Sequence, residues 1–74
     1  MPKLYSGREI VKALKKAGFE IVGQKGSHIK LRGFRNGKLQ TVIVPYHKIV
    51  AYGTFSSILN QSSMTKVEFE KFLK

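Results

Sequence analysis

The 74-residue sequence predicts an α+β domain in two layers, a three-stranded antiparallel sheet with helices packed on one face. Two observations carry this prediction. Residues 6–9 and 65–68 both have the pattern Ser/Thr-x-x-Glu, a capping box that starts a helix. Asn36-Gly37 is a strong hairpin signal between two segments rich in strand-forming residues. The predicted order is α-β-β-β-α, with a short extra helix at the C-terminal end.

The first helix is predicted over residues 7–17. Apolar residues recur there at helical spacing and form one stripe: Ile10, Ala13, Leu14 and Ala17. Gly18 follows as a helix stop. The basic residues lie largely off the apolar stripe: Arg8, Lys12, Lys15 and Lys16. The helix is therefore expected to pack by one side and to present a basic outer side.

Three strands are expected next, over residues 19–24, 28–33 and 38–44. Residues 23–27 contain two glycines and should turn the chain. Sequential strands joined by short turns form an antiparallel meander.

Pro45 ends the third strand. Thr54 is a candidate N-cap for a second helix, which Ser62-Ser63 interrupts, and the capping box at residues 65–68 starts a short last helix. This order of elements is that of the double-stranded RNA-binding domain (dsRBD). We therefore expect residues 1–74 to form a single dsRBD-like domain.

Composition narrows the class of partner. Fourteen Lys and Arg residues against four acids give a net charge of +10, which attracts polyanions such as nucleic acid, an acidic membrane or an acidic protein. Without cysteine there is neither a disulfide nor a cysteine zinc site. The longest purely apolar run, residues 42–44, is far below the roughly 20 residues of a membrane span, and the N-terminus lacks an apolar signal core. A cytoplasmic protein that does not enter membranes is expected.

The strand that begins at His28 gathers the most suggestive side chains. Because strand residues alternate between faces, His28, Lys30 and Arg32 share one face. Ile29 and Leu31 point the other way and can join a core. The first face then holds one imidazole and two fixed positive charges, a plausible arrangement for a site that acts on a phosphate backbone.

The sequence lacks the residues that several other catalytic mechanisms need. Two-metal hydrolysis needs several neighbouring carboxylates, and the acids are Glu9, Glu20, Glu68 and Glu70, of which the first and third are capping residues. No metal is therefore expected. Cysteine nucleophiles are excluded. Ser27 adjoins His28 in sequence and suits a turn or a hydrogen bond to phosphate better than nucleophilic attack.

Metal-free RNA cleavage remains, because RNA carries its own nucleophile, the 2′-hydroxyl. Histidine suits the proton transfers, and Lys and Arg suit stabilisation of the added charge. His28 is the candidate catalyst, against the alternative of an exposed strand residue without a role. His47 is a candidate second proton donor, a phosphate contact or a plain loop residue.

The sequence resembles the HicA-type toxins of HicA–HicB toxin–antitoxin systems over nearly its whole length. The resemblance lies in five fragments in the family's order: Leu14 to Phe19, Gly26-Ser27-His28, Val44-Pro45-x-His47, Gly53 to Gln61, and Glu68-Phe69. It implies a dsRBD-like fold and a metal-independent endoribonuclease that cleaves mRNA, an mRNA interferase. It also implies His28 as the catalytic acid/base and a HicB-type antitoxin that inhibits the toxin.

Two positions depart from the family pattern. Ser62-Ser63-Met64 lacks the glycine common between the last two helices, which affects a turn. Ile29 stands where a second histidine is often found, so a two-histidine mechanism would have to recruit His47.

The sequence thus predicts a ribonuclease toxin with mRNA and the antitoxin as partners and with no cofactor. Residues expected to bind RNA are Lys25, Ser27, Lys30, Arg32, His47 and Lys48. Two alternatives stay open. One is a non-catalytic, basic RNA-binding module of dsRBD-like fold, and the other is a domain that binds an acidic protein partner.

Overall fold

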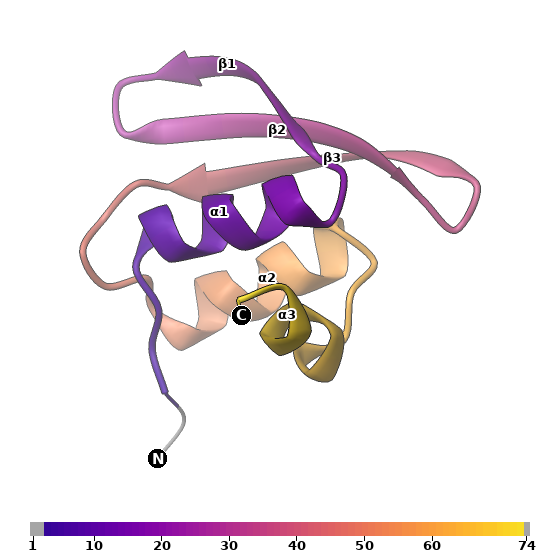
Figure 1. Ribbon diagram of the computed structural model, residues 1–74. Coiled ribbons are helices and arrows are strands. Elements are labelled where there is room, and N and C mark those ends of the chain that lie inside the picture. The colour runs from indigo at the N-terminus through magenta and orange to yellow at the C-terminus, as the bar shows by residue number, and fades with distance from the viewer. Residues whose placement is uncertain (1–2, 74) are drawn as a thin grey trace.

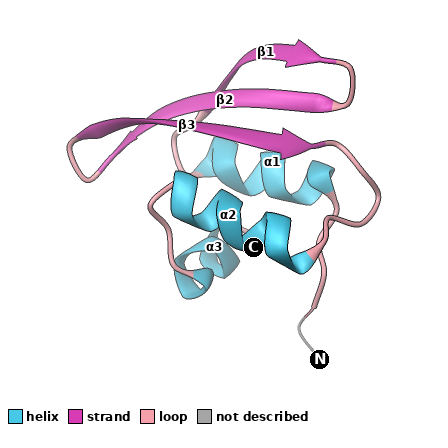
Figure 2. Ribbon diagram, turned by 180° about the vertical axis from the view of Figure 1, so that it is seen from behind, coloured by secondary structure: helices cyan, strands magenta, loops and turns pink. Residues whose placement is uncertain are grey.

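The helices and strands follow one another in the order that the sequence predicts. A computed structural model describes residues 3–73. Its elements are α1 (Gly7–Lys16), β1 (Glu20–Lys25), β2 (His28–Arg35), β3 (Lys38–Pro45), α2 (Tyr52–Gln61) and α3 (Lys66–Phe72). The sheet is antiparallel in the order β1-β2-β3, and all three helices lie on one side of it (Figure 1). The α+β fold class is therefore confirmed, and the opposite face of the sheet carries no helix (Figure 2).

Both capping boxes form and fix the starts of α1 and α3. Ser6 Oγ accepts the backbone N–H of Glu9 at 3.0 Å, and the Glu9 carboxylate accepts that of Ser6 at 3.0 Å. Thr65 and Glu68 form the same reciprocal pair. Each box satisfies two N–H groups that an uncapped helix would leave without partners.

The predicted start of α2 is wrong. The helix begins at Tyr52 with Ala51 as its N-cap, and Thr54 lies inside the first turn. The cause is tertiary: Val50 pairs with Tyr5 in an isolated bridge, in which Val50 N donates to Tyr5 O at 2.8 Å. This bridge fixes the chain next to the helix start, and α2 then begins without a side-chain cap.

The core fills the space between the inner face of the sheet and the helices. Strand alternation buries Ile29 and Leu31 of β2 together with Val42 and Val44 of β3. Three rings from distant segments meet below them, with centroids 4.9–5.3 Å apart: Tyr5, Phe55 and Phe69. Such edge and tilted ring pairs contribute about 0.5–1.5 kcal/mol beyond their area burial. The rings therefore join the N-terminal segment, α2 and α3.

The hairpin between β2 and β3 sets the register of the sheet. Asn36 and Gly37 both have positive φ, 54° and 74°, as a two-residue primed turn requires. Arg35 then pairs with Lys38, and the pairing continues to His28 opposite Pro45. The start of β2 is thereby placed beside the end of β3. None of the helices in residues 3–73 is long and apolar enough to cross a membrane.

Candidate functional site

Three segments meet at the end of the sheet where β2 begins: the turn between β1 and β2, the end of β3 and the start of α1 (Figures 1 and 2). Two backbone hydrogen bonds join them. Tyr46 N donates to Ser27 O at 2.6 Å, and Gly7 N donates to His47 O at 2.8 Å. A Cβ atom on Gly7 would lie 2.3 Å from Pro45 O, so glycine is needed for this approach of α1 to β3.

His28 stands at the edge of this junction, on the bare outer face of the sheet. It is the first residue of β2 and pairs with Lys25 on one side and Pro45 on the other. Gly26, at φ +59°, makes the two-residue turn from which the strand starts. The His28 side chain is exposed. It is therefore open to a ligand.

The predicted grouping of His28 with Lys30 and Arg32 is confirmed, because the even-numbered residues of β2 are exposed while Ile29 and Leu31 are buried. Lys25 faces the same way, since directly paired residues of antiparallel strands share a face. Arg32 Nε donates to Thr41 Oγ1 at 3.4 Å, which orients the guanidinium over β3. The outer face thus carries Lys30 and Arg32 in a line along β2 that begins at His28, with Lys25 beside His28 on β1.

His47 follows the end of β3 and contacts the turn that precedes His28. Its Nε2 lies 3.4 Å from Ser27 Oγ, and the tautomer of the imidazole decides which atom donates. The loop after β3, which contains His47, also forms one wall of an open cavity of about 280 Å³. That cavity is lined by Ser6, Arg8, Tyr46, His47 and Lys48. Of the predicted residues, Lys25, Ser27, His28, His47 and Lys48 gather at this end of the sheet.

Arg8 is a candidate that the sequence analysis placed only on the outer side of a helix. Arg8 lines the same cavity as His47 and Lys48, so three basic side chains surround one space. In the sequence, only the position of Arg8 off the apolar stripe of the first helix indicated that its side chain is exposed. The proximity itself depends on the pairing of β3 with β2, which carries the loop back to the start of α1.

Most of the carboxylates lie away from the end of the sheet where β2 begins. Those of Glu9 and Glu68 accept backbone N–H groups in the capping boxes, and these hydrogen bonds lower the pKa of both side chains from the usual 4.5. Glu70 accepts the Tyr5 hydroxyl at 3.4 Å. In residues 3–73 no three His, Asp or Glu side chains form a group that could hold a metal ion.

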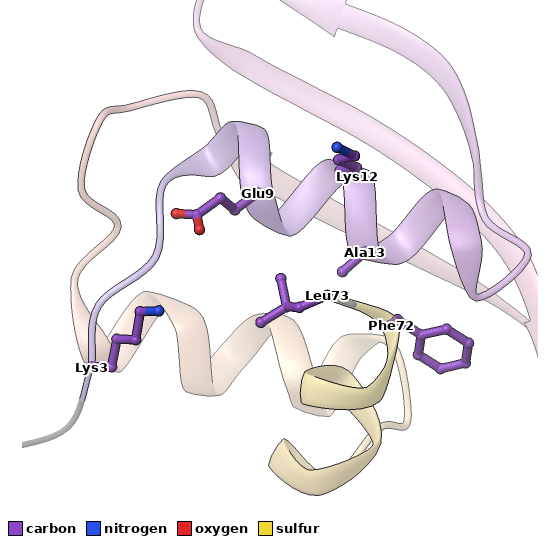
Figure 3. A pocket seen from close by; sticks show the side chains of 6 residues that line it. All are labelled: Lys3, Glu9, Lys12, Ala13, Phe72 and Leu73. Atoms are coloured by element: carbon purple, nitrogen blue, oxygen red, sulfur yellow. The ribbon is translucent and has the colours of Figure 1, made fainter.

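A second cavity, of about 290 Å³, lies away from the sheet, between the N-terminal segment, α1 and α3. Figure 3 shows Glu9 and Lys3 extending toward this space, with Leu73 at its floor. Its lining residues are Lys3, Glu9, Lys12, Ala13, Phe72 and Leu73. None of the predicted site residues is among them, and Glu9 is already engaged in its capping box. We therefore place the candidate site at the end of the sheet.

Comparison with protein families places the chain beside a known family. The family described as the HicA toxin of bacterial toxin–antitoxin systems matches residues 7–64, well over half of the chain. The matched range contains α1, the whole sheet, α2 and both histidines. Curated protein sequences gave no match. On the family match, the chain belongs to the HicA toxins of bacterial toxin–antitoxin systems.

Proposed function

We propose that this toxin is a metal-independent endoribonuclease that cleaves mRNA and that a HicB-type antitoxin inhibits it. Family membership makes the chain a toxin with an antitoxin partner. The observation that carries the enzymatic part is the exposed His28, in line with Lys30 and Arg32 on a bare sheet face and opposite Lys25. An mRNA substrate places the protein in the cytoplasm.

The proposed reaction is an internal transfer at phosphorus. His28 removes the proton of the 2′-hydroxyl, and the freed oxygen attacks the adjacent phosphorus. The bond from phosphorus to the 5′-oxygen breaks, and that oxygen takes up a proton. The products are a 2′,3′-cyclic phosphate and a 5′-hydroxyl end. Lys25 and Lys30, which flank the site, stabilise the added negative charge on the phosphate.

The other predicted residues bind the substrate around this centre. Arg32 extends the basic line along β2. Lys48 lies with Arg8 in the cavity behind the turn and holds a neighbouring phosphate. Ser27 positions His47, which is the candidate donor of the second proton.

A cleavage assay with excess EDTA tests the proposal. Wild-type protein should cut a long RNA and leave 5′-hydroxyl ends. His28→Ala should slow cleavage by about 10²–10⁴-fold, the usual contribution of one general acid or base. Lys71→Ala, an exposed position on α3, is the matched control and should cleave like wild type. Circular dichroism establishes that each variant is folded.

Other outcomes identify the alternatives. Equal cleavage by His28→Ala would refute the catalytic assignment, and activity abolished by EDTA would indicate a metal. Intact RNA that binds in a salt-sensitive manner would make the chain an RNA-binding module. Absence of RNA binding at low salt would leave the basic face to an acidic protein. Growth arrest on expression, relieved by the product of an adjacent gene, would support the toxin–antitoxin pairing.

A further inference from the structure

Phe34 is the most exposed aromatic residue of the outer sheet face. Its side chain is 73% exposed, whereas Phe19, Phe55 and Phe69 are at most 2% exposed. It lies on β2 on the same face as Arg32, because the two are separated by one residue. The line of functional side chains that begins at His28 therefore ends in an uncovered ring.

The ring belongs to a larger feature, a shallow hollow of about 390 Å³ at the end of the sheet remote from His28. Leu39 pairs directly with Phe34 across β2 and β3 and is 56% exposed. Val22 joins them from the bulge in β1, where the register shifts between Ile21 and Gly23. The full lining is Gly18, Glu20, Val22, Arg32, Gly33, Phe34 and Leu39. Apolar side chains thus share this hollow with a guanidinium.

The charges on this face select the occupant. Lys25 lies beside His28 at the candidate catalytic end, Lys30 follows it along β2, and Arg32 lines the hollow itself, so the face favours an anionic chain. The hollow itself contains the carboxylate residue Glu20, which repels a phosphate but can accept a hydrogen bond from a base amino group. A polyanion with flat, apolar groups that carry N–H donors matches both parts of the face.

We infer that the outer face of β2 is a track for single-stranded RNA, in which Phe34 stacks on one base at a distance from the phosphodiester held at His28. The two residues are six positions apart, about 20 Å along a strand. This inference rests on the proposed function for the identity of the substrate. The RNA is single-stranded because a ring can stack only on an unpaired, accessible base, and the bases of a duplex are stacked inside it. Phe34 is thus a positioning residue.

Binding of a labelled 2′-O-methyl oligonucleotide, followed by fluorescence anisotropy at fixed salt, tests the inference without cleavage, because the methyl group removes the nucleophile. Phe34→Ala and Phe34→Leu should both weaken binding by about 5- to 150-fold, the usual range for one stacked base. Phe34→Tyr retains the ring and should bind like wild type. Val67→Ala, which removes an apolar side chain 63% exposed on α3, is the control and should also bind like wild type.

Three results would overturn the inference. Wild-type binding by Phe34→Leu would show that the ring is not used and would leave the hollow to a protein partner. An equal effect of Phe34→Leu on a duplex of the same sequence would remove the single-strand requirement. If the wild-type protein did not bind the oligonucleotide, the RNA track itself would be refuted. Because the oligonucleotide cannot react, Phe34-dependent binding would support the inference even if the cleavage assay failed, and cleavage that does not depend on Phe34 would leave the proposed function intact.

Discussion

Ser27 Oγ lies 3.4 Å from His47 Nε2, although the two residues are 20 positions apart in the chain. The contact holds His47 against the turn that precedes His28 and β2. We expect His47 to protonate the departing 5′-oxygen, so that His47→Ala slows cleavage by about 10²–10⁴-fold. Ser27→Ala should have a smaller effect, because it removes a positioning hydrogen bond and leaves the imidazole.

A sulfur-substituted substrate measures this role directly. In a substrate whose 5′-bridging oxygen is replaced by sulfur, the leaving group departs as a thiolate and needs no proton. His47→Ala should then cleave at nearly the wild-type rate, whereas His28→Ala should stay slow because the 2′-hydroxyl still requires a base. A His47→Ala variant that is fully active on ordinary RNA, or that sulfur does not rescue, would remove His47 from the chemistry.

Lys30 should contribute to affinity through charge alone. For single strands, the logarithm of the binding constant falls linearly with the logarithm of the salt concentration, and each phosphate contact adds about 0.7 to the slope. Lys30→Ala should therefore reduce the slope by about 0.7 when binding to a 2′-O-methyl oligonucleotide is titrated with salt. Lys71→Ala on α3 should leave the slope unchanged, and a reduction of equal size there would mean that net charge, not the outer face, governs binding.

The residues of the candidate site differ in how far the sequence could place them. The face that groups His28, Lys30 and Arg32 follows from the period of two within one strand, and the structure confirms it. The positions of His47 and Arg8 depend on the loop after β3, whose path is set by backbone contacts with Ser27 and Gly7. Such contacts join segments far apart in sequence and leave no local pattern.

The same distinction holds for the fold. Capping boxes and the Asn36-Gly37 turn are local signals, and the elements that they predicted are present. The prediction from Thr54 was wrong because Val50 is fixed by its bridge to Tyr5, an interaction across most of the chain. A cap residue indicates where a helix can begin, but tertiary pairing decided where α2 does begin.

Ser63 should be a site of easy stabilisation. It occupies the left-handed region at φ 55°, where a side chain costs about 1–2 kcal/mol relative to glycine. Ser63→Gly should therefore raise the free energy of unfolding by about 0.5–1 kcal/mol, once the greater entropy of glycine in the unfolded chain is subtracted. Urea denaturation measures the change. Ser56→Gly, in the interior of α2, is the matched control and should lower stability by about 0.5 kcal/mol. The same sign at both positions would contradict the backbone argument.

Glu68 should make the fold sensitive to acid. The backbone N–H of Thr65 and, more weakly, the Arg35 guanidinium lower its pKa from the usual 4.5. A lowered pKa in the folded state means that the stabilisation is fully present above about pH 4.5 and is lost as the pH falls through the folded-state value. The melting temperature of wild-type protein should therefore drop below about pH 4.5.

Glu68→Gln separates this titration from the cap itself. Glutamine can still accept the Thr65 N–H in a capping box, but it neither ionises nor forms the ion pair that joins Arg35 at the end of β2 to α3. The variant should melt below wild type near neutral pH and should lose less on acidification, so that the two melting curves converge in acid. Glu20→Gln, at an exposed position of β1, should retain the acid sensitivity of wild type. If Glu68→Gln lost as much stability as wild type on acidification, a group other than Glu68 would dominate the acid response.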